Sequence, residues 1–482
     1  MPTLRSSRLV RALARQGLDL TIDGSVLTVR TAGDPHAVPA RILLPADLPL
    51  EGKAARQLAT LGRLRHPDGG RAVAVAGTPD LHPGDSGVAI GSVLATEGLV
   101  LPAAVGSDIH CGMRLHVVDL PVERFLAERD GFVADLVGDF FYGARDVTMA
   151  AATMRALFSQ GLLGWLDALR DRPSGCMAAA DVDQVEAEAE RVMGLGSLGG
   201  AVRWAPHDLV PEHGWVRDGG LGTIGGGNHF VEVQHVAEVV DRAAAFHLGV
   251  REGQLAVMIH SGSRNVGKHI GGWWRDRCRA LWPEGVAHPP GRLFALSETG
   301  TPDEVTAYLE AEATGGNYAF VNRALLAELL RARLRQRFGD VEAPLVVDVS
   351  HNLTRREGDR WVARKGACPA GPGEPVVVPG SMGSSSWLAT GGGDETCLCS
   401  ASHGAGRATS RFAMARTRRG GRHSSDAALG LEGVDCVTPR AERRVEEAPA
   451  AYKPIASVIE VQQRHGVLSR VARLEPVLTF KA

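Results

Sequence analysis

Four histidines share one kind of position in the sequence, beside a glycine-rich turn or at the end of a predicted strand: His229, His260, His351 and His403. His229 opens a predicted strand after a glycine-rich turn, while His260 and His351 end the predicted strands 255–259 and 345–349. A strand end holds a side chain rigidly at the rim of a sheet, where ligand sites are commonly built. A single histidine is usually structural, but four in similar positions favour a shared site.

A fifth group adds a carboxylate and a thiol three residues apart, in Asp108-Ile109-His110-Cys111-Gly112. A thiolate combined with imidazoles and one carboxylate suits Mn²⁺, Zn²⁺, Fe²⁺ or Co²⁺ better than Mg²⁺ or Ca²⁺. Structural zinc sites use short local Cys/His pairs, whereas these donors are spread along the chain. The pattern therefore favours a catalytic metal site assembled by the fold. Cys397-Leu398-Cys399 has the wrong spacing for a zinc finger, and we interpret it as structural.

Two glycine-rich loops, residues 222–228 and 379–386, could cradle phosphates through their backbone N–H groups. Neither is a P-loop, because no Gly-Lys-Ser/Thr follows. Gly404 and Gly406 are expected to leave the imidazole of His403 open to a phosphorus centre, with which it could form a covalent intermediate. The arginines that follow could neutralise phosphate charge or form only a solvated surface. They are Arg407, Arg411, Arg416, Arg418, Arg419 and Arg422.

The composition is that of a soluble globular protein. The 482 residues include 59 glycines, yet 44% are hydrophobic and only 22% are charged, which excludes a disordered or collagen-like chain. A net charge of -2 does not indicate that the whole protein binds nucleic acid strongly, but it does not exclude a local basic groove. Seven cysteines without a regular framework indicate a reducing compartment, so we expect a cytoplasmic protein. No apolar run approaches the ~18 residues of a membrane span.

The elements that must position these residues mix helices and strands without a regular alternation. This favours an α+β or a complex α/β fold over a Rossmann sheet. Residues 1–50 are predicted to form a small N-terminal appendage, with a helix at 5–16 and strands at 18–22 and 26–30, and residues 51–482 the catalytic domain.

Within that domain we expect a mostly helical stretch at 120–195 and a helical insertion at about 285–340. The insertion's helix is predicted at 302–338 and opens with Thr301-Pro302-Asp303-Glu304, a capping box with proline at the first helical position. The tail from Ile455 is predicted as a helix and a last strand. Further strands are predicted at 72–76, 88–90, 99–101, 114–118 and 375–378.

In combination, these motifs resemble the RtcB family of RNA-splicing ligases, in order from about residue 50 to the end of the chain. The resemblance rests on 108–112, 225–230 with Glu232, 260–264, 350–352, 364–367, 379–383, 403–407, 451–453 and Lys481. It implies an RtcB-type α+β fold, a single large mixed α/β domain with a central metal and nucleotide cleft, and a ligase that depends on GTP and Mn²⁺. The implied substrates are RNA ending in a 2′,3′-cyclic phosphate or 3′-phosphate and RNA with a 5′-hydroxyl, in RNA repair or tRNA splicing.

The resemblance also implies roles for individual residues. His403 would attack the α-phosphorus of GTP and become guanylylated; the guanylyl group would pass to the RNA 3′-phosphate, and the 5′-hydroxyl would displace GMP. Two Mn²⁺ ions are expected at Asp108, Cys111, His229, His260 and His351, with Cys111 bridging. Nucleotide contacts are expected from Asn228, Glu232, Asn352, Pro379, Gly380, Ser381, Met382, His403, Gly404, Ala405, Gly406, Arg407, Tyr452 and Lys481. RNA contacts are expected from Arg264, Arg364, Lys365 and Arg411, and an activator protein is a candidate partner.

Two positions depart from the family pattern. Asp85-Ser86 places an acid where members usually have an aromatic or basic residue, and Ala363 stands where many have a polar one. These departures are compatible with a paralogue of altered end preference or weaker ligation. Two other functions stay open: a metal-dependent RNA end-processing phosphoesterase without ligation, and a non-enzymatic RNA-binding accessory protein.

Overall fold

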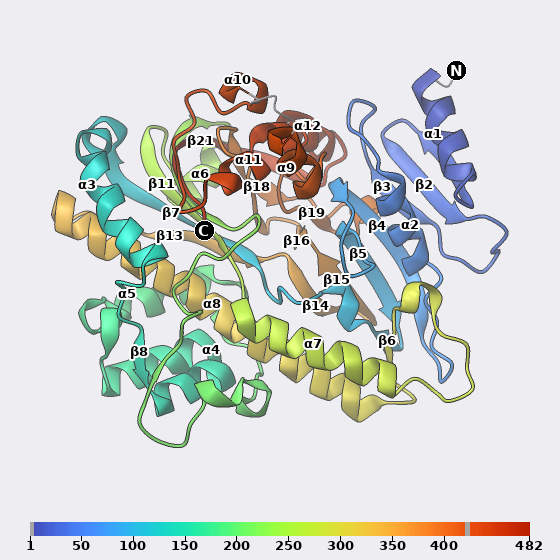
Figure 1. Cartoon of the computed structure of the whole chain (residues 1–482), viewed down its shortest axis with the longest axis horizontal. Coiled ribbons are helices and arrows are strands. Elements are labelled where there is room, and N and C mark those ends of the chain that lie inside the picture. Colours follow the sequence, from blue (N-terminus) through green and yellow to red (C-terminus); the bar gives the residue numbers. More distant parts are fainter. Residues whose placement is uncertain (1–3, 420–424) are drawn as a thin grey trace.

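The computed structural model describes residues 4–419 and 425–482, with side chains described for 8–415 and 425–482. These residues form a mixed α/β fold with two large sheets and a layer of long helices (Figure 1), which confirms the predicted α+β class. None of the described helices is long and apolar enough to cross a membrane.

The first sheet has seven strands and carries the N-terminal part of the chain (Figure 1). Its order is β1 (Leu18–Asp23), β2 (Val26–Thr31), β3 (Ala40–Leu43), β4 (Arg71–His82), β5 (Ile90–Glu97), β15 (Arg360–Lys365) and β14 (Asn352–Glu357). Helices α1 (Leu4–Ala14) and α2 (Gly52–Leu61) accompany it. Strand β3 pairs in parallel with β4, and Leu13 and Val29 share one hydrophobic cluster with Leu58 and Val75. The described part of the predicted N-terminal appendage therefore extends the sheet of the rest of the chain.

The second sheet has eight strands and carries the predicted metal ligands at one edge. Its path is β13 (Leu345–Ser350), β7 (Gly112–Pro121), β11 (Gln254–Ser261), β10 (Phe230–Val239), β21 (Leu468–Phe480), β18 (Ser386–Gly391) and β17 (Pro375–Val378), with β20 (Cys436–Val437) beside β21. The predicted final strand is β21, and the helix before it is α12 (Ile455–Arg464). The predicted strand 114–118 is the middle of the longer β7.

Helix α8 (Pro302–Phe338), which is the helix of the predicted insertion, runs through the core. Most of its residues from Ala311 to Arg331 are buried, and it packs against α3 (Val122–Phe141), α4 (Ala151–Asp171) and α7 (Arg264–Ala280). In Figure 1 it crosses the molecule beneath the second sheet, with α7 alongside. The helix begins at Pro302 as predicted, but the predicted capping box does not form. The Thr301 hydroxyl instead donates to the carbonyl oxygen of Ser297, 3.1 Å away.

The remaining elements are short and connect these layers. The predicted strand 88–90 is wrong except for its last residue, because β5 begins at Ile90. The stretch 120–195, predicted as mostly helical, also contains the short strand β8 (Thr148–Ala150). Side chains of Arg416, Arg418, Arg419 and Arg422, from the predicted basic cluster, lie outside the described part. The other elements are β6 (Leu99–Val100), α5 (Val182–Ala187), β9 (Trp215–Arg217), α6 (Arg242–Leu248), β12 (Leu296–Ser297), β16 (Ala367–Pro369), β19 (Ser400–Ser402), α9 (Arg411–Arg419), α10 (Asp426–Leu429) and α11 (Ala441–Glu446).

Candidate active site

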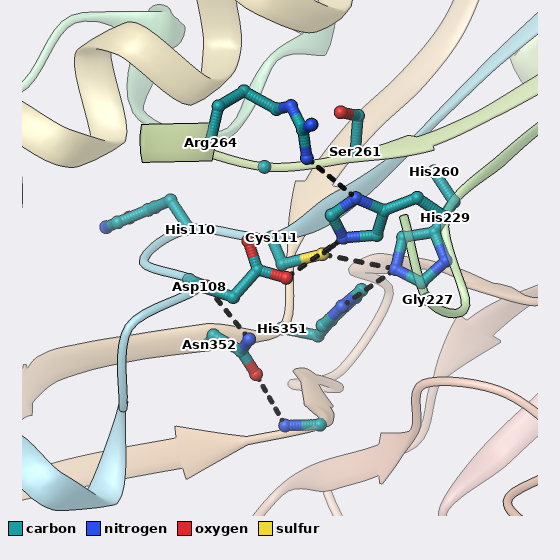
Figure 2. Close-up of polar contacts among 12 residues, drawn as sticks. Asp108, His110, Cys111, Gly227, His229, His260, Ser261, Arg264, His351 and Asn352 are labelled. Carbon is teal, nitrogen blue, oxygen red and sulfur yellow. Dashed lines mark hydrogen bonds and ion pairs between the residues drawn. The ribbon is translucent and has the colours of Figure 1, made fainter. Parts of the chain in front are cut away.

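Four neighbouring strands bring the predicted metal ligands together at one edge of the second sheet. Cys111 directly precedes β7, His229 directly precedes β10, His260 lies in β11, and His351 directly follows β13. The strand register aligns these positions, because His260 pairs with Phe230, and Gly112 pairs with both Ser261 and Ser350. Figure 2 shows the side chains pointing toward one another.

The donor atoms form two groups that share Cys111. Cys111 Sγ lies 3.2 Å from Nε2 of both His229 and His260. Asp108 Oδ2 is 2.9 Å from His229 Nε2, and the Nε2 atoms of His260 and His351 are 3.3 Å apart. Within each group, Cys111–His260–His351 and Asp108–Cys111–His229, all donors lie within 4.8 Å of one another. Each group could hold a cation, and the nitrogen, sulfur and oxygen donors suit Mn²⁺ or a similar transition metal.

The protonation states favour binding of a cation. His229 Nδ1 lies 3.1 Å from the carbonyl oxygen of Ile224, so its N–H donates there and Nε2 presents its lone pair to the cluster. Burial, reinforced by neighbouring histidines, holds the pKa of His260 and of His351 well below the usual range, so both imidazoles are neutral ligands.

The two acidic ligands differ. Burial would raise the pKa of Asp108, but His229 outweighs it and holds that pKa well below the usual range, so the carboxylate is ionised. Burial and the charge of Asp108 raise the pKa of the Cys111 thiol. A thiol becomes a good ligand only when a cation stabilises its thiolate, so metal binding and deprotonation of Cys111 are coupled.

One fully buried arginine ties together the backbone segments that carry these ligands. Arg323 of α8 donates through Nη1 to the carbonyl oxygens of His110 (2.8 Å) and Ser261 (3.0 Å), and through Nε to Asp348 Oδ1 (2.8 Å). His110 and Ser261 are adjacent to Cys111 and His260, and Asp348 lies three residues before His351. Sequence reasoning missed Arg323, because nothing in the local pattern of a long helix distinguishes a buried arginine from an exposed one.

Asn352, predicted as a nucleotide contact, instead holds the backbone of the loop that carries Asp108. Its side-chain nitrogen donates to the carbonyl oxygen of Asp108 (2.9 Å), and its side-chain oxygen accepts from the backbone N–H of Gly366 (2.7 Å) (Figure 2). Both bonds fix backbone close to the ligands.

His403 lies beside the metal ligands and is oriented by a buried carboxylate. Its ring centroid is 4.9 Å from that of His351, and its Nδ1 is 2.6 Å from Asp80 Oδ2. With the Nδ1 proton held by Asp80, Nε2 carries the lone pair. Burial alone would raise the pKa of Asp80, but His403 and a hydrogen bond from Thr78 lower it, so the carboxylate stays ionised. Asp80 was not among the predicted site residues, although Pro79-Asp80-Leu81-His82 was recognisable as a motif.

The glycines around His403 differ in what a side chain at each position would meet. Gly406 has φ +74°, and a Cβ there would lie 2.2 Å from the backbone oxygen of Asp80, so this glycine allows the two segments to pack. A Cβ at Gly404 would meet only Pro379, at 3.4 Å. At Gly366, a Cβ would lie 2.3 Å from Ile90 Cγ2 and 3.1 Å from His403 Cε1, so this glycine allows close packing against both side chains.

A cavity of about 540 Å³ adjoins His403 and collects the predicted nucleotide contacts. All of them except Asn352 line it. They are Asn228, Glu232, Pro379, Gly380, Ser381, Met382, His403, Gly404, Ala405, Gly406, Arg407, Tyr452 and Lys481. A larger cavity of about 1100 Å³ lies elsewhere and contains none of the predicted site residues.

One buried carboxylate organises three cations along this cavity. Glu447 is fully buried and lies 2.6 Å from Arg411 Nε, 3.2 Å from Arg407 Nη1 and 3.7 Å from Lys481 Nζ, and it also accepts from the Tyr452 hydroxyl. Burial would raise the pKa of Glu447, but the three cations lower it. Three positive charges around one negative charge leave an excess that suits phosphate groups. Glu447 was also missed, since it lies in an unremarkable polar stretch.

Glu232 lies in a buried part of the same cavity. It is 4% exposed, and its carboxyl accepts from Gln234 Nε2 at 2.6 Å and from the Thr479 hydroxyl. Burial raises the pKa of Glu232 to about 7, against the opposing effects of these hydrogen bonds and of Lys481.

The four predicted RNA contacts are placed differently. Arg411 lines the cavity. Arg264 lies beside the candidate metal ligands, with Nη1 3.5 Å from His229 Nδ1. The Lys365 ammonium contacts the Ser86 hydroxyl, and burial lowers its pKa to about 8 despite Asp85 nearby. Arg364 is 1% exposed and pairs with Glu357 at 2.6 Å, so the structure gives it a packing role away from the surface.

The two departures from the family pattern lie in different surroundings. Asp85 lines the cavity that contains His403, so an acid does stand at its wall. Ala363 is buried in the hydrophobic cluster of the first sheet and pairs with Leu94 of β5. The change at Ala363 therefore concerns packing.

These features bring together a candidate metal centre, a buried histidine paired with a carboxylate, and a cavity lined with cations. The chain belongs to the RtcB family: the family model described as tRNA-splicing ligase RtcB matches residues 57–482. The chain is 33% identical over 440 residues to an RNA-splicing ligase RtcB of Mycobacterium tuberculosis, covering 83% of this chain and 94% of the relative. It is 32% identical over 469 residues to a tRNA-splicing ligase RtcB of Archaeoglobus fulgidus, covering 89% and 91%. To an RNA-splicing ligase RtcB2 of Escherichia coli it is 30% identical over 446 residues, covering 90% and 93%. The resemblance drawn from the motifs is confirmed.

Proposed function

We propose that this protein is a GTP-dependent RNA ligase that joins RNA ending in a 3′-phosphate or 2′,3′-cyclic phosphate to RNA with a 5′-hydroxyl, in tRNA splicing or RNA repair. Family membership supports ligation of RNA. The observation that carries the covalent mechanism is the buried Asp80–His403 pair, 2.6 Å between Oδ2 and Nδ1, at the wall of a cavity lined with cations.

In the first step, His403 Nε2 attacks the α-phosphorus of GTP. An N–P bond forms, the bond from that phosphorus to the pyrophosphate oxygen breaks, and pyrophosphate leaves. Asp80 stabilises the positive charge that develops on the imidazole, while Arg407 and Lys481 neutralise charge on the phosphates. The product is a His403–GMP phosphoramidate, a reactive donor of the guanylyl group.

Guanine rather than adenine is favoured by Glu232. The guanine base carries N–H donors at N1 and at its 2-amino group, which a carboxylate can accept; adenine presents an acceptor at N1. Because Glu232 is buried in the same cavity as His403, it can fix the base while the phosphates lie among the cations.

In the later steps, an oxygen of the RNA 3′-phosphate takes the guanylyl group from His403. The 5′-hydroxyl of the second RNA then attacks the 3′-phosphorus, and GMP leaves as the new phosphodiester forms. A cyclic end is first opened by water to a 3′-phosphate. Two Mn²⁺ ions held by Asp108, Cys111, His229, His260 and His351 would orient phosphates and lower the pKa of the attacking hydroxyl when bound.

The decisive experiment is covalent labelling. The protein is incubated with GTP labelled at the α-phosphate and with Mn²⁺, then denatured and separated from free nucleotide. We expect label on the wild type and none on His403→Ala, since only His403 provides the nucleophile. Absence of label from the wild type with every divalent metal tried would refute the ligase mechanism. Processing of a cyclic RNA end without GTP would then support the phosphoesterase.

A further inference from the structure

Phe412 is a large aromatic side chain that the fold leaves in solvent beside the candidate active site. It is 72% exposed, lies in the first turn of α9, and lines the same cavity as His403. Because most of its surface is exposed, this side chain buries little apolar area, and its hydrophobic contribution to stability is small.

The local structure enforces this exposure. Ser410 caps α9: its hydroxyl accepts from the backbone N–H of Ala413 at 3.2 Å, and its carbonyl oxygen accepts from that of Met414 at 3.0 Å. Met414 is 5% exposed and packs in the hydrophobic cluster that contains Met382. Residues two apart on a helix point about 200° away from each other. Anchoring Met414 inward therefore turns Phe412 outward, toward the mouth of the cavity.

An aromatic ring beside cations is the combination by which proteins hold single-stranded nucleic acid: the cations contact the backbone and the ring stacks on a base. Arg411, adjacent to Phe412, lines the cavity and supplies such a cation. The burial of Glu232, 4% exposed, separates the inner part of the cavity from the rim that carries Phe412. If guanine occupies the inner part, the rim is left for the RNA whose 3′-phosphate must reach His403.

We propose that Phe412 stacks on the 3′-terminal base of the RNA that carries the phosphate, and so determines how that end is held. This inference rests on the proposed function. Because every base has a π-face, the contact accepts any terminal base, and it is strongest for purines, which present the larger ring.

The test compares Phe412→Ala with Phe412→Tyr, which keeps a ring. Phe246→Ala is a matched control, because Phe246 is 83% exposed on α6 and does not line the cavity. Binding of 3′-phosphate RNA is measured by fluorescence anisotropy without GTP, with one RNA that has its terminal base and one that is abasic at that nucleotide. Labelling of His403 by GTP is measured separately.

We expect Phe412→Ala to weaken binding of the normal RNA by about 5- to 150-fold. Phe412→Tyr and Phe246→Ala should bind it like the wild type. On the abasic RNA, all four proteins should bind alike.

Three results would overturn the inference: unchanged binding of the normal RNA by Phe412→Ala, an equal loss on both RNAs, or a raised KM for GTP in the labelling reaction, which would place the ring on guanine. Failure of the wild type to label would instead refute the proposed function, and the binding comparison would still report on Phe412.

Discussion

At the scale of single residues, a hydrogen bond decides which atom of His403 can react. Asp80 Oδ2 is 2.6 Å from Nδ1, and Lys453 Nζ donates to the carbonyl oxygens of Pro79 (2.9 Å) and Leu81 (2.7 Å), which fixes the segment that carries Asp80. A histidine whose Nδ1 proton is held in this way presents Nε2 as the nucleophile. The carboxylate is therefore a positioning group whose removal should slow the covalent step.

The first prediction concerns Asp80→Asn. The amide keeps the shape of the side chain but can donate to Nδ1, which favours the wrong tautomer of His403. We expect the rate of His403 guanylylation to fall by about 10²- to 10⁴-fold, with little change in GTP affinity. Single-turnover labelling measures the rate and calorimetry the affinity. A rate within threefold or so of the wild type would show that Asp80 does not set the tautomer.

A second prediction at this scale uses the pKa of Glu232, which burial raises to about 7. Below that pH the carboxyl holds its proton, and above it the carboxylate can accept two N–H bonds from guanine. GTP affinity should therefore rise by up to about tenfold per pH unit below pH 7 and level off above it. Titration calorimetry between pH 5.5 and about 8.5 tests this.

Glu232→Gln is the control for ionisation of the phosphates and of other groups. This variant should bind GTP weakly. Its GTP affinity should not show the rise below pH 7 that ionisation of Glu232 causes in the wild type. If wild type and variant have parallel pH profiles, the ionisation of Glu232 does not govern nucleotide binding.

At the scale of elements, strand ends supply the ligands and a helix holds them in place. The neighbouring strands β13, β7, β11 and β10 align their ends at one edge, and α8 reaches that edge from the core through Arg323. A guanidinium that bonds two carbonyl oxygens and one carboxylate can fix three segments together, which a lysine ammonium cannot do in the same planar geometry.

We expect Arg323→Lys and Arg323→Met to lower Mn²⁺ affinity by about 10- to 100-fold. The methionine variant should also lose about 3–5 kcal/mol of stability, because it leaves Asp348 buried without this partner. Arg337→Met is the control, since Arg337 lies on the same helix and pairs with Asp135 at 2.7 Å, away from the ligands. Electron paramagnetic resonance of Mn²⁺ titrations measures affinity. Circular dichroism establishes that each variant is folded, and wild-type affinity in folded Arg323→Lys would contradict the role.

At the scale of the whole molecule, the N-terminal segment belongs to the same folded unit as the site but does not reach it. Leu13, Leu18, Leu27 and Val29 are buried in the cluster of the first sheet, whereas no residue of 4–50 lines the cavity with His403. Stability and chemistry should therefore respond differently to loss of this segment.

Deletion of residues 1–31 removes α1, β1 and β2 and leaves β3 as a sheet edge. Each buried side chain that is lost contributes about 1.5–3 kcal/mol, so we expect the Tm to fall by several degrees and the protein to associate through the new edge. His403 labelling at low temperature should persist. Thermal unfolding and light scattering measure the two effects. An unchanged Tm would show that the segment is an independent appendage.

The sequence by itself determined the chemistry of the site and much of its local structure. The motifs and the family they resemble predicted the five residues whose donor atoms the structure brings together, and all but one of the predicted nucleotide contacts line the cavity beside His403. Local periodicity also predicted the start of α8 at Pro302 and the helix and strand at the C-terminus. Each of these motifs and elements is formed by residues close together in the chain, so its pattern is visible without the fold.

Only the tertiary structure decided which groups support the chemistry. Asp80 meets His403 across 323 positions of the chain, and Glu447 gathers Arg407, Arg411 and Lys481 from both sides of itself. Whether α8 is peripheral or central, and whether Arg364 is exposed or buried, depends likewise on what packs against them. Local spacing carries no record of such contacts, because the partners are brought together only when the sheets and the core form.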